Sequence, residues 1–411
     1  MTRSHAESDQ DLADFPSFPM PRAQGCPLDP APGLSALQSE RPLLRVRSWD
    51  GTTPWLVTRY AEFRALLADR RVSSNRLQEG YPDISPSTAA RREKGNSFMF
   101  MDDPEHARLR RMVTGAFTTR RMEQMRPGLQ RMVDDLIDEM LAGPSPVDLV
   151  TAFALPVPSL AICQLLGVPY ADHGFFQQAG RKFVNQYKPE AAKEAQEELT
   201  VYLDGLVDRK LADPGDDLLS RVAAEQVATG NLSRRELVAM ALLLLLAGHE
   251  TTANMIALGT YALLTRPDEL ALVRASDDPQ LAVRTVEELL RYLSIVHSGQ
   301  RRVALDDIEI AGEVIRKGEG IIFAGDIANR DPAVFPDPDR LDVHRDARSH
   351  VAFGFGVHQC LGQPLARVEL QIVYGTLYRR IPTLALAADP AQIPFKHDAF
   401  IYGVYELPVT W

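Results

Sequence analysis

Apolar side chains recur at helical intervals over most of the chain. In residues 132–140 they repeat every three and four positions, the pattern of an amphipathic helix. The most apolar stretch runs from Ser233 to about Thr265, and Ser233-Arg-Arg-Glu236 fits a capping box at its start. The pattern predicts a chain dominated by helices, with one long helix at its centre.

A smaller part of the sequence has the texture of short strands. Residues 55–60 are rich in β-prone side chains and are predicted to pair with a preceding strand around the Asp50-Gly51 turn. Further short strands, an irregular meander and a last helix before a terminal strand pair are predicted in the following ranges: Arg302–Ala311, Gly312–Ile315, Gly320–Ala324, Asn329–His350 (meander) and Leu361–Arg380 (helix).

No repeat or clear linker divides the chain. Residues 1–40 are punctuated by prolines and are interpreted as a loose lead-in, so that residues 41–411 form one domain. Gln78–Asn96 is polar and rich in Pro and Gly, which is typical of a long surface loop, and such loops are often functional lids. Lys188–Lys210 is predicted to be a solvated helix that stops at Asp213-Pro-Gly-Asp216.

Composition narrows the possible classes of protein. The 411 residues carry a net charge of −10, which argues against a general nucleic-acid binder. The first 25 residues contain no apolar signal-peptide core, and the apolar run Leu237–Gly248 has only twelve residues, too few to cross a bilayer. The three cysteines, Cys26, Cys163 and Cys360, lie far apart and form no C-x-x-C pair. We therefore expect a cytoplasmic protein without a disulfide framework, a zinc site or a membrane anchor.

The most informative segment is the cysteine loop, Phe353-Gly-Phe-Gly-Val-His-Gln-Cys-Leu-Gly362. Its glycines allow a close approach of the backbone to a ligand or a positive φ. Cys360 precedes a helix with Pro364 in its first turn, and the positive end of that helix would stabilise a thiolate. An isolated cysteine is more often a small buried apolar residue. Here the spacing F-x-x-G-x-H-x-C-x-G favours a single sulfur ligand for a large flat cofactor, with haem iron as the obvious candidate.

This loop resembles the haem-binding loop of the cytochrome P-450 superfamily. Four more segments match motifs of that family in its order: His106-Ala-Arg-Leu-Arg110, Ala247-Gly-His-Glu-Thr-Thr252, Glu288-Leu-Leu-Arg291 and Asp337-Pro-Asp-Arg340. The resemblance implies the family's fold, mainly α with a small β region and shaped as an α-helical triangular prism. It also implies haem b as cofactor, with Cys360 as the axial ligand of the iron.

The long helix is expected to form the oxygen side of the cofactor. Ala247 and Thr251 are four residues apart on one face, and Gly248 lies beside them, so that a flat ring and a diatomic ligand could press against the helix. The Thr251 hydroxyl can bond back to the carbonyl of residue 247. Glu250 and Thr251 are the predicted catalytic pair, offering a proton path through an apolar wall. The alternative is a buried polar pair that caps a kink.

Other motif residues are expected to bind or brace the cofactor. Glu288 and Arg291 could form an exposed ion pair, but the resemblance implies a buried structural network with Arg340 that supports the cysteine loop. Propionates of a haem are anions and need cationic partners. The resemblance and the spacing assign this role to His106, Arg110, Arg302 and His358, with Arg302 preferred over Arg301. Phe353 is expected to pack on the ring near the sulfur, and Gly362 to belong to the same pocket, although an ordinary core Phe would look the same in sequence.

Basic residues of the segment 108–121 gather on an otherwise acidic molecule. They form either a solvated face or a docking patch for an acidic electron-transfer protein: Arg108, Arg110, Arg111, Arg120 and Arg121. The resemblance implies a separate ferredoxin and a ferredoxin reductase as electron donors.

The implied reaction is insertion of one oxygen atom of O₂ into a bulky hydrophobic molecule, such as a secondary metabolite or a xenobiotic. The resemblance assigns substrate contacts to the loop 77–100, the segment 175–187, residues 243–247, Ser294–Val296 and the terminal strand near Ile401. The alternatives are a haem-thiolate peroxygenase or oxidative coupling enzyme and, from a different class, a haem sensor or carrier without turnover. The Glu250-Thr251 pair argues against the peroxygenase, since peroxide-driven enzymes need no proton relay.

Overall fold

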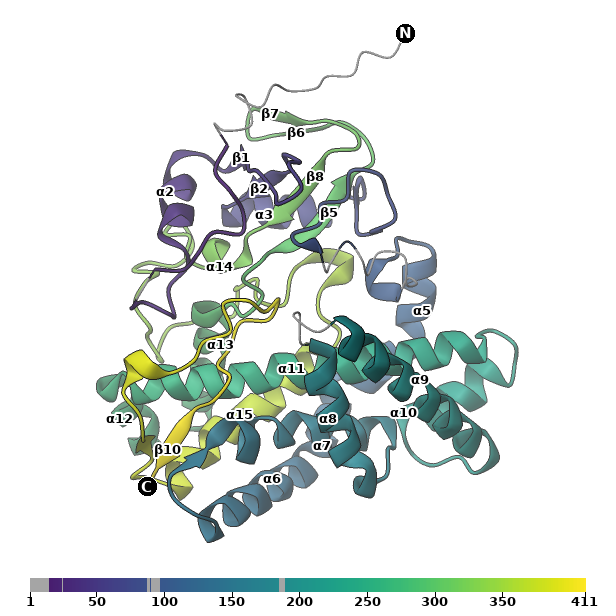
Figure 1. Ribbon diagram of the computed structural model, residues 1–411, viewed down its shortest axis with the longest axis vertical. Coiled ribbons are helices and arrows are strands. Elements are labelled where there is room, and N and C mark those ends of the chain that lie inside the picture. Colours follow the sequence, from purple (N-terminus) through teal and green to yellow (C-terminus); the bar gives the residue numbers. More distant parts are fainter. Residues whose placement is uncertain (1–14, 24, 87–88, 90–96, 185–188) are drawn as a thin grey trace. The chain divides into compact units, whose positions relative to one another are not determined.

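The structure, a computed structural model, describes residues 15–411 except 24, 87–88, 90–96 and 185–188. The chain divides into two compact units that are each discontinuous in sequence (Figure 1). The sheet unit comprises residues 1–102, 296–339 and 351–359, and the helical unit comprises residues 103–295, 340–350 and 360–411. Whether residues 41–411 behave as one domain stays a prediction.

A five-stranded sheet organises the sheet unit. Its strands lie in the order β1 (Leu43–Arg45), β2 (Trp55–Val57), β8 (Gly320–Phe323), β5 (Gln300–Ala304) and β3 (Val72–Ser73), and only β2 and β8 run parallel. A separate hairpin joins β6 (Ile308–Ile310) to β7 (Glu313–Ile315). The helices of this unit are α2 (Pro32–Glu40), α3 (Tyr60–Ala68), α14 (Gly325–Ala328) and the short turns η1 (Phe98–Phe100) and η6 (Gly356–His358).

Both faces of this sheet are apolar, because alternate residues of its central strands point to opposite sides. Val57 and Phe323 pair across β2 and β8 and belong to the core cluster that contains Phe63 of α3. Their neighbours Leu56 and Ile322 belong to a second cluster with the following residues of the N-terminal segment: Phe18, Ala31 and Leu34. The expectation of a loose lead-in is therefore wrong for this segment, since it covers one face of the sheet.

The helical unit contains most of the helices that the structure describes, including the longest, α11 (Arg234–Leu264). They are α5 (Glu105–Thr114), α6 (Thr119–Ala142), α7 (Pro156–Leu166), α8 (His173–Val184), α9 (Pro189–Ala212), α10 (Leu218–Val222), α11 (Arg234–Leu264), α12 (Pro267–Ala275), α13 (Pro279–Leu293) and α15 (Gln363–Arg380). The short turns are η2 (Gly115–Phe117), η3 (Val150–Ala154), η4 (Tyr170–Asp172), η5 (Ala223–Val227) and η7 (Pro390–Gln392). A small sheet has the order β4 (Val147–Asp148), β10 (Pro408–Thr410) and β9 (Ala385–Leu386).

Helix α11 is the long central helix that the apolar pattern predicted. The capping box at Ser233 is present, and α11 packs on α7, α9, α13 and α15 of the same unit (Figure 1). By length and composition α11 could cross a membrane, but 72% of its most apolar window is buried inside the protein, as in the core helix of a globular fold. Helices α9 and α15 and the strands β5 to β8 also lie within or next to their predicted ranges. Part of the predicted lid, residues 78–96, lies outside the described residues.

Candidate active site

The sulfur of Cys360 is the centre of the candidate site. Cys360 lies between η6 and the first turn of α15, and it is accessible to solvent. The surrounding protein raises the pKa of its thiol, whereas hydrogen bonds from the backbone N–H groups of Gly362 and Gln363 and the charges of Arg110 and Arg367 lower it. The net effect is a raised pKa, because the many protein atoms around the sulfur remove solvent from it even though its outer face is accessible. The free thiol is therefore a poor nucleophile, and a metal ion would deprotonate it on coordination.

The backbone before the cysteine needs the glycines that the loop motif contains. Gly354 and Gly356 have φ of +70° and +72°, conformations that side chains rarely adopt. A Cβ on Gly356 would also lie 2.2 Å from the carbonyl oxygen of Leu67. Gly362 serves differently, as the N-cap of α15 with φ of −79°, and a Cβ there would lie 4.0 Å from Sγ of Cys360. Only two of the three predicted glycines therefore have a positive φ.

Small and polar residues interrupt the buried surface of α11. Ala247 is exposed, and Gly248 and Thr251 are partly exposed, on a helix whose neighbouring residues are mostly buried. The Thr251 hydroxyl donates a hydrogen bond of 2.8 Å to the carbonyl oxygen of Ala247, as predicted. Accessible small residues in the middle of a core helix leave room for a flat ligand beside it.

Glu250 is held away from the Thr251 hydroxyl. Its carboxylate accepts a hydrogen bond of 3.1 Å from Asn254 Nδ2 and lies 3.6 Å from Nζ of Lys396. Within the part of the chain that the structure describes, no hydrogen bond joins the side chains of Glu250 and Thr251. The two predicted catalytic residues are adjacent on α11 but are not in direct contact, so a shared relay needs a rearrangement or bridging water.

Helix α5 places two of the predicted cations. His106 is buried, and its Nδ1 lies 3.1 Å from Oδ1 of Asp103. Arg110, one turn later, is partly buried; burial lowers the pKa of its guanidinium, and the nearby Cys360 opposes that shift. The charge of Arg110 in turn lowers the pKa of the Cys360 thiol, so the guanidinium is a cation near the sulfur.

Arg302 and His358 belong to the sheet unit. Burial lowers the pKa of the Arg302 guanidinium, and its hydrogen bond among the described residues goes to the carbonyl oxygen of Arg301, at 2.7 Å. Arg301 itself lies 3.8 Å from a carboxylate oxygen of Asp83. Among the described residues no ion pair within 4 Å joins Arg302 to a carboxylate, although the charge of Asp102 acts on it from farther away. A buried guanidinium of this kind suits an anionic ligand, which supports the preference for Arg302. His358 Nε2 is 2.8 Å from the Ser74 hydroxyl.

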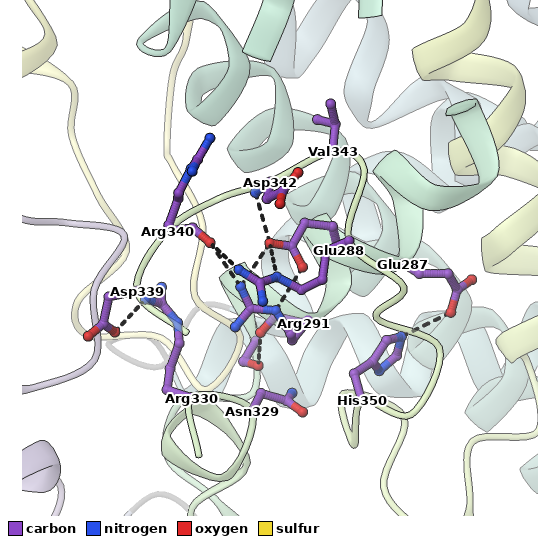
Figure 2. Close-up of polar contacts among 12 residues, drawn as sticks. Glu287, Glu288, Arg291, Asn329, Arg330, Asp339, Arg340, Asp342, Val343 and His350 are labelled. Carbon is purple, nitrogen blue, oxygen red and sulfur yellow. Dashed lines mark hydrogen bonds and ion pairs between the residues drawn. The ribbon is translucent and has the colours of Figure 1, made fainter. Parts of the chain in front are cut away.

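Glu288 and Arg291 form the fully buried pair that the resemblance implied, not an exposed one. Arg291 Nε and Nη2 donate to the two carboxylate oxygens of Glu288 at 2.7 and 2.8 Å, and neither side chain is exposed (Figure 2). The backbone N–H of Asp342 donates to Oε1 of Glu288 at 3.0 Å. The pair therefore fixes the chain where it enters the segment 340–350 of the helical unit.

The comparisons with known proteins agree with this geometry. The family model described as Cytochrome P450 matches residues 166–383. Cytochrome P450 GfsF of Streptomyces halstedii is 56% identical over 410 residues, which cover 98% of each chain. The chain belongs to the cytochrome P450 family. It is therefore an oxidoreductase of the monooxygenase type, and its fold is the P450 fold.

Other P450 relatives match over almost the whole chain. Pentalenic acid synthase of Streptomyces avermitilis is 50% identical over 395 residues, covering 96% of this chain and 97% of that protein. The crystal structure of GfsF matches with a TM-score of 0.92 at 57% identity, covering 96% of this chain and 100% of that one. The mycinamicin VIII C21 methyl hydroxylase MycCI of Micromonospora griseorubida matches with a TM-score of 0.89 at 41% identity, covering 97% and 100%.

The residues present fit the haem iron that the P450 family uses. Within the helical unit, Cys360 supplies one accessible sulfur with two backbone N–H donors, and α11 supplies an accessible stretch of small residues. The cofactor roles of all the predicted contacts stay predictions, those of Cys360 and Arg302 included, as do those of His106, His358, Phe353 and Gly362.

One structural residue of this P450 was assigned wrongly. The guanidinium of Arg340 is 65% exposed and comes no closer than 4.0 Å to a carboxylate of Glu269. Arg340 takes part in the buried network only through its carbonyl oxygen, which accepts from Arg291 Nη2 at 3.2 Å (Figure 2). The second cation on Glu288 is Arg345, whose Nε lies 3.2 Å from Oε1. The meander has no period, so its sequence does not show which arginine points inward.

A second buried network next to the cysteine was missed. Arg367 Nε and Nη2 donate to the Glu287 carboxylate at 2.7 and 3.0 Å. Nε2 of His350 lies 3.2 Å from the same carboxylate (Figure 2). Arg367 Nη1 also donates to Oε1 of Gln363 at 2.7 Å, and the N–H of Gln363 faces the Cys360 sulfur. Arg367 lies two turns after Cys360 on α15, a position that sequence alone could have flagged.

Several arginines of the basic segment 108–121 already interact with other groups of the protein. Arg108 pairs with Glu105 and Glu236, and Arg121 lies 3.3 Å from a carboxylate oxygen of Asp216. Arg110 faces the cysteine. Of these five arginines, only Arg111 and Arg120 are exposed and form no ion pair among the described residues.

Proposed function

We propose that this P450 inserts one oxygen atom from O₂ into a bulky, mostly hydrophobic organic molecule, by hydroxylation or epoxidation, with haem b as its cofactor. The observation that carries the proposal is the Cys360 sulfur, accessible to a ligand and facing two backbone N–H donors. Several relatives are named for secondary metabolites or sterol-like molecules, including pentalenic acid synthase and a vitamin D3 dihydroxylase. The substrate is accordingly a secondary metabolite or a xenobiotic.

The chain's own residues divide the work between two sides of the cofactor. When bound, the haem supplies iron that activates O₂, with electron donation from the sulfur favouring O–O cleavage. Cys360 holds the iron, and the cations named above, with Arg302 first, bind the propionates. Ala247 and Gly248 leave space against α11. The Thr251 hydroxyl and the Glu250 carboxylate hold and pass protons on the side of α11.

Electrons come from NAD(P)H through a separate ferredoxin and its reductase. Among the described residues, no group of three or more His, Cys, Asp or Glu lies close enough together to hold a metal ion. The acidic net charge leaves no role for nucleic acid, and the cytoplasm is the proposed location.

The first test is the absorption spectrum of the reduced, CO-bound protein. Wild type is expected to show the red-shifted Soret band of a thiolate ligand, and Cys360→Ser is expected to lose it. A panel is then screened for a substrate-induced spin shift. It contains mycinamicin VIII, which is bound in the MycCI structure, filipin I, which is bound in the structure of the relative CYP105P1, and pentalenic acid and vitamin D3, which appear in the names of two relatives. A colourless wild type, an unchanged Soret band in Cys360→Ser, or no spin shift with any of the four compounds would contradict the proposal.

Turnover separates the remaining alternatives. With ferredoxin, reductase and NADH, ¹⁸O from ¹⁸O₂ is expected in the product. Product formed only with added peroxide would identify a peroxygenase, and tight binding without NADH consumption would identify a sensor or carrier.

A further inference from the structure

The carboxylate of Glu250 interacts with side chains from two different segments, α11 and the C-terminal region. Asn254, one turn later on α11, donates from Nδ2 both to Oε2 of Glu250, at 3.1 Å, and to its carbonyl oxygen, at 2.8 Å. Lys396 brings its Nζ to 3.6 Å from Oε2, and the side chains of Glu250 and Lys396 are only 8% and 14% exposed. His249 Nδ1 also lies 3.9 Å from Oε1 of Glu250. A carboxylate this deeply buried needs a cation, and the ammonium of Lys396 is the nearer of the two basic groups.

Lys396 belongs to a C-terminal hairpin, defined here as residues 394–405. Two backbone hydrogen bonds of 2.8 Å close it, from Lys396 N to Gly403 O and from Tyr405 N to Pro394 O, and Phe395 bridges Val404. The ring of Phe395 stacks on that of Tyr402, with centroids 6.0 Å apart. These contacts join the two arms of the hairpin and hold the backbone of Lys396 in place.

The same hairpin is fastened to α11 and to a predicted substrate segment. Gly403 lies so close to Asn254 that a Cβ would come within 1.7 Å of its Oδ1. The backbone N–H of Tyr402 donates to the carbonyl oxygen of Ile295 at 2.8 Å. Ile295 and Ile401, at two of the predicted substrate contacts, are thus joined through one hairpin to both groups that hold Glu250. All of these residues belong to the helical unit.

We propose that Lys396 is a positioning residue that makes proton delivery depend on the substrate. Substrate against Ile295 and Ile401 shifts the hairpin and draws Nζ of Lys396 away from Glu250. The freed carboxylate takes a proton from the solvent side and passes one proton toward the Thr251 hydroxyl, so that no net charge is left behind. This inference rests on the proposed function, because it assigns the trigger of the same relay.

The coupling itself is tested by hydrogen exchange on the haem-loaded protein. The probe is the panel compound with the largest spin shift. In wild type the probe is expected to change amide exchange both in the hairpin 394–405 and in residues 250–254 of α11. In Lys396→Met it is expected to change exchange in the hairpin alone, whereas Lys396→Arg restores the response of α11. An unchanged response of α11 in Lys396→Met overturns the proposal.

Turnover gives a second, independent readout. Lys396→Met is expected to raise the ratio of hydrogen peroxide to product at least threefold and to increase the solvent deuterium isotope effect, with the dissociation constant from the spin shift within twofold of wild type. Glu250→Gln combined with Lys396→Met should be no worse than Glu250→Gln alone. Lys317→Met, at an exposed lysine, is the matched control. Equal losses in Lys396→Met and Lys396→Arg, with a lower unfolding temperature in both, would show a merely structural role.

These results separate the two hypotheses. If no NADH-dependent product forms with any compound, the proposed function fails, but the exchange experiment still decides whether Lys396 links the hairpin to α11. If product forms and the peroxide ratio of Lys396→Met equals that of wild type, only the inference about Lys396 fails.

Discussion

The Glu369 carboxyl of α15 shows how strongly burial can act on one side chain. Glu369 is 2% exposed, and its Oε1 has no hydrogen-bond partner among the described residues. Burial raises the pKa of Glu369 to about 8, although a hydrogen bond from Thr252 opposes the shift. The carboxyl is therefore protonated in the folded protein at neutral pH, where the same group is ionised in the unfolded chain.

This shift makes stability depend on pH. Because the folded-state pKa of Glu369 is raised from 4.5 to about 8, its contribution is fully present below pH 4.5 and is lost as the pH rises through about 8. Over that window the group lowers the free energy of unfolding by up to about 5 kcal/mol. Glu369→Gln is expected to flatten the pH dependence between pH 5 and 8 in urea unfolding. Glu406→Gln, at an exposed position, should leave it unchanged. Equal slopes for wild type and Glu369→Gln would refute the assignment.

Glu369 could have been noticed in the sequence. It occupies a position of α15 between Leu365 and Ile372, which are both buried, so it falls within the apolar stripe of the helix. Its charged neighbours made α15 look like an ordinary amphipathic helix. Periodicity shows that an acid lies on the buried face, but the size of its pKa shift depends on how completely neighbouring helices cover it.

At the scale of elements, arginine contacts attach the segment 340–350 to α13. The sequence alone does not show which arginine of the segment makes the buried contact. Arg345 is expected to carry this contact, because its side chain is 12% exposed and faces a fully buried Glu288. Arg345→Gln should lower the free energy of unfolding by about 3 kcal/mol, since it removes one cation from a buried carboxylate. Arg340→Gln is the matched control and should cost less than about 0.5 kcal/mol, because its guanidinium is exposed. Guanidinium unfolding of both variants checks this, and a larger loss for Arg340→Gln would restore the original assignment.

The contact between α13 and α15 depends on a second buried acid. Burial would raise the pKa of Glu287, but hydrogen bonds from His350 and Arg367 outweigh it and hold the pKa at about 2. Its stabilising contribution is therefore present above pH 4.5 and is lost as the pH falls through about 2, opposite in sign to that of Glu369. Glu287→Gln is expected to reduce stability at pH 7 by about 3 kcal/mol and to lower the fraction of protein that retains haem. Unfolding curves and the Soret-to-protein absorbance ratio measure the two effects, and unchanged values for both would exclude the role.

Helices were predicted better than the contacts around them. The bounds of α11 follow from Ser233 and its capping partner Glu236, and the Glu288–Arg291 pair follows from an i, i+3 spacing. Lys396 could not be found in this way, since it lies in an irregular segment far from Glu250 in the sequence. Contacts between distant segments depend on the packing of whole elements, which no local pattern records.

For the molecule as a whole, the relevant property is the contrast between its net charge of −10 and the basic segment of α5 and α6. For the proposed electron donor, an acidic ferredoxin, long-range repulsion would slow the approach, so the proposal requires a local cation patch that steers it. Most of the five predicted arginines are engaged within the protein, which leaves Arg111 and Arg120 among the described residues for this task.

Charge reversal at these two positions tests that assignment. Arg111→Glu combined with Arg120→Glu is expected to raise the KM for the ferredoxin several-fold and to weaken the salt dependence of electron transfer, because exposed charges act through screened long-range attraction. The spin shift and the CO spectrum should stay unchanged, since neither residue is assigned to the cofactor. Arg348→Glu serves as control, because Arg348 is an exposed arginine of the segment 340–350 that pairs with Asp346. A salt dependence that is flat in wild type, or equal in the double variant, would show that the partner docks elsewhere.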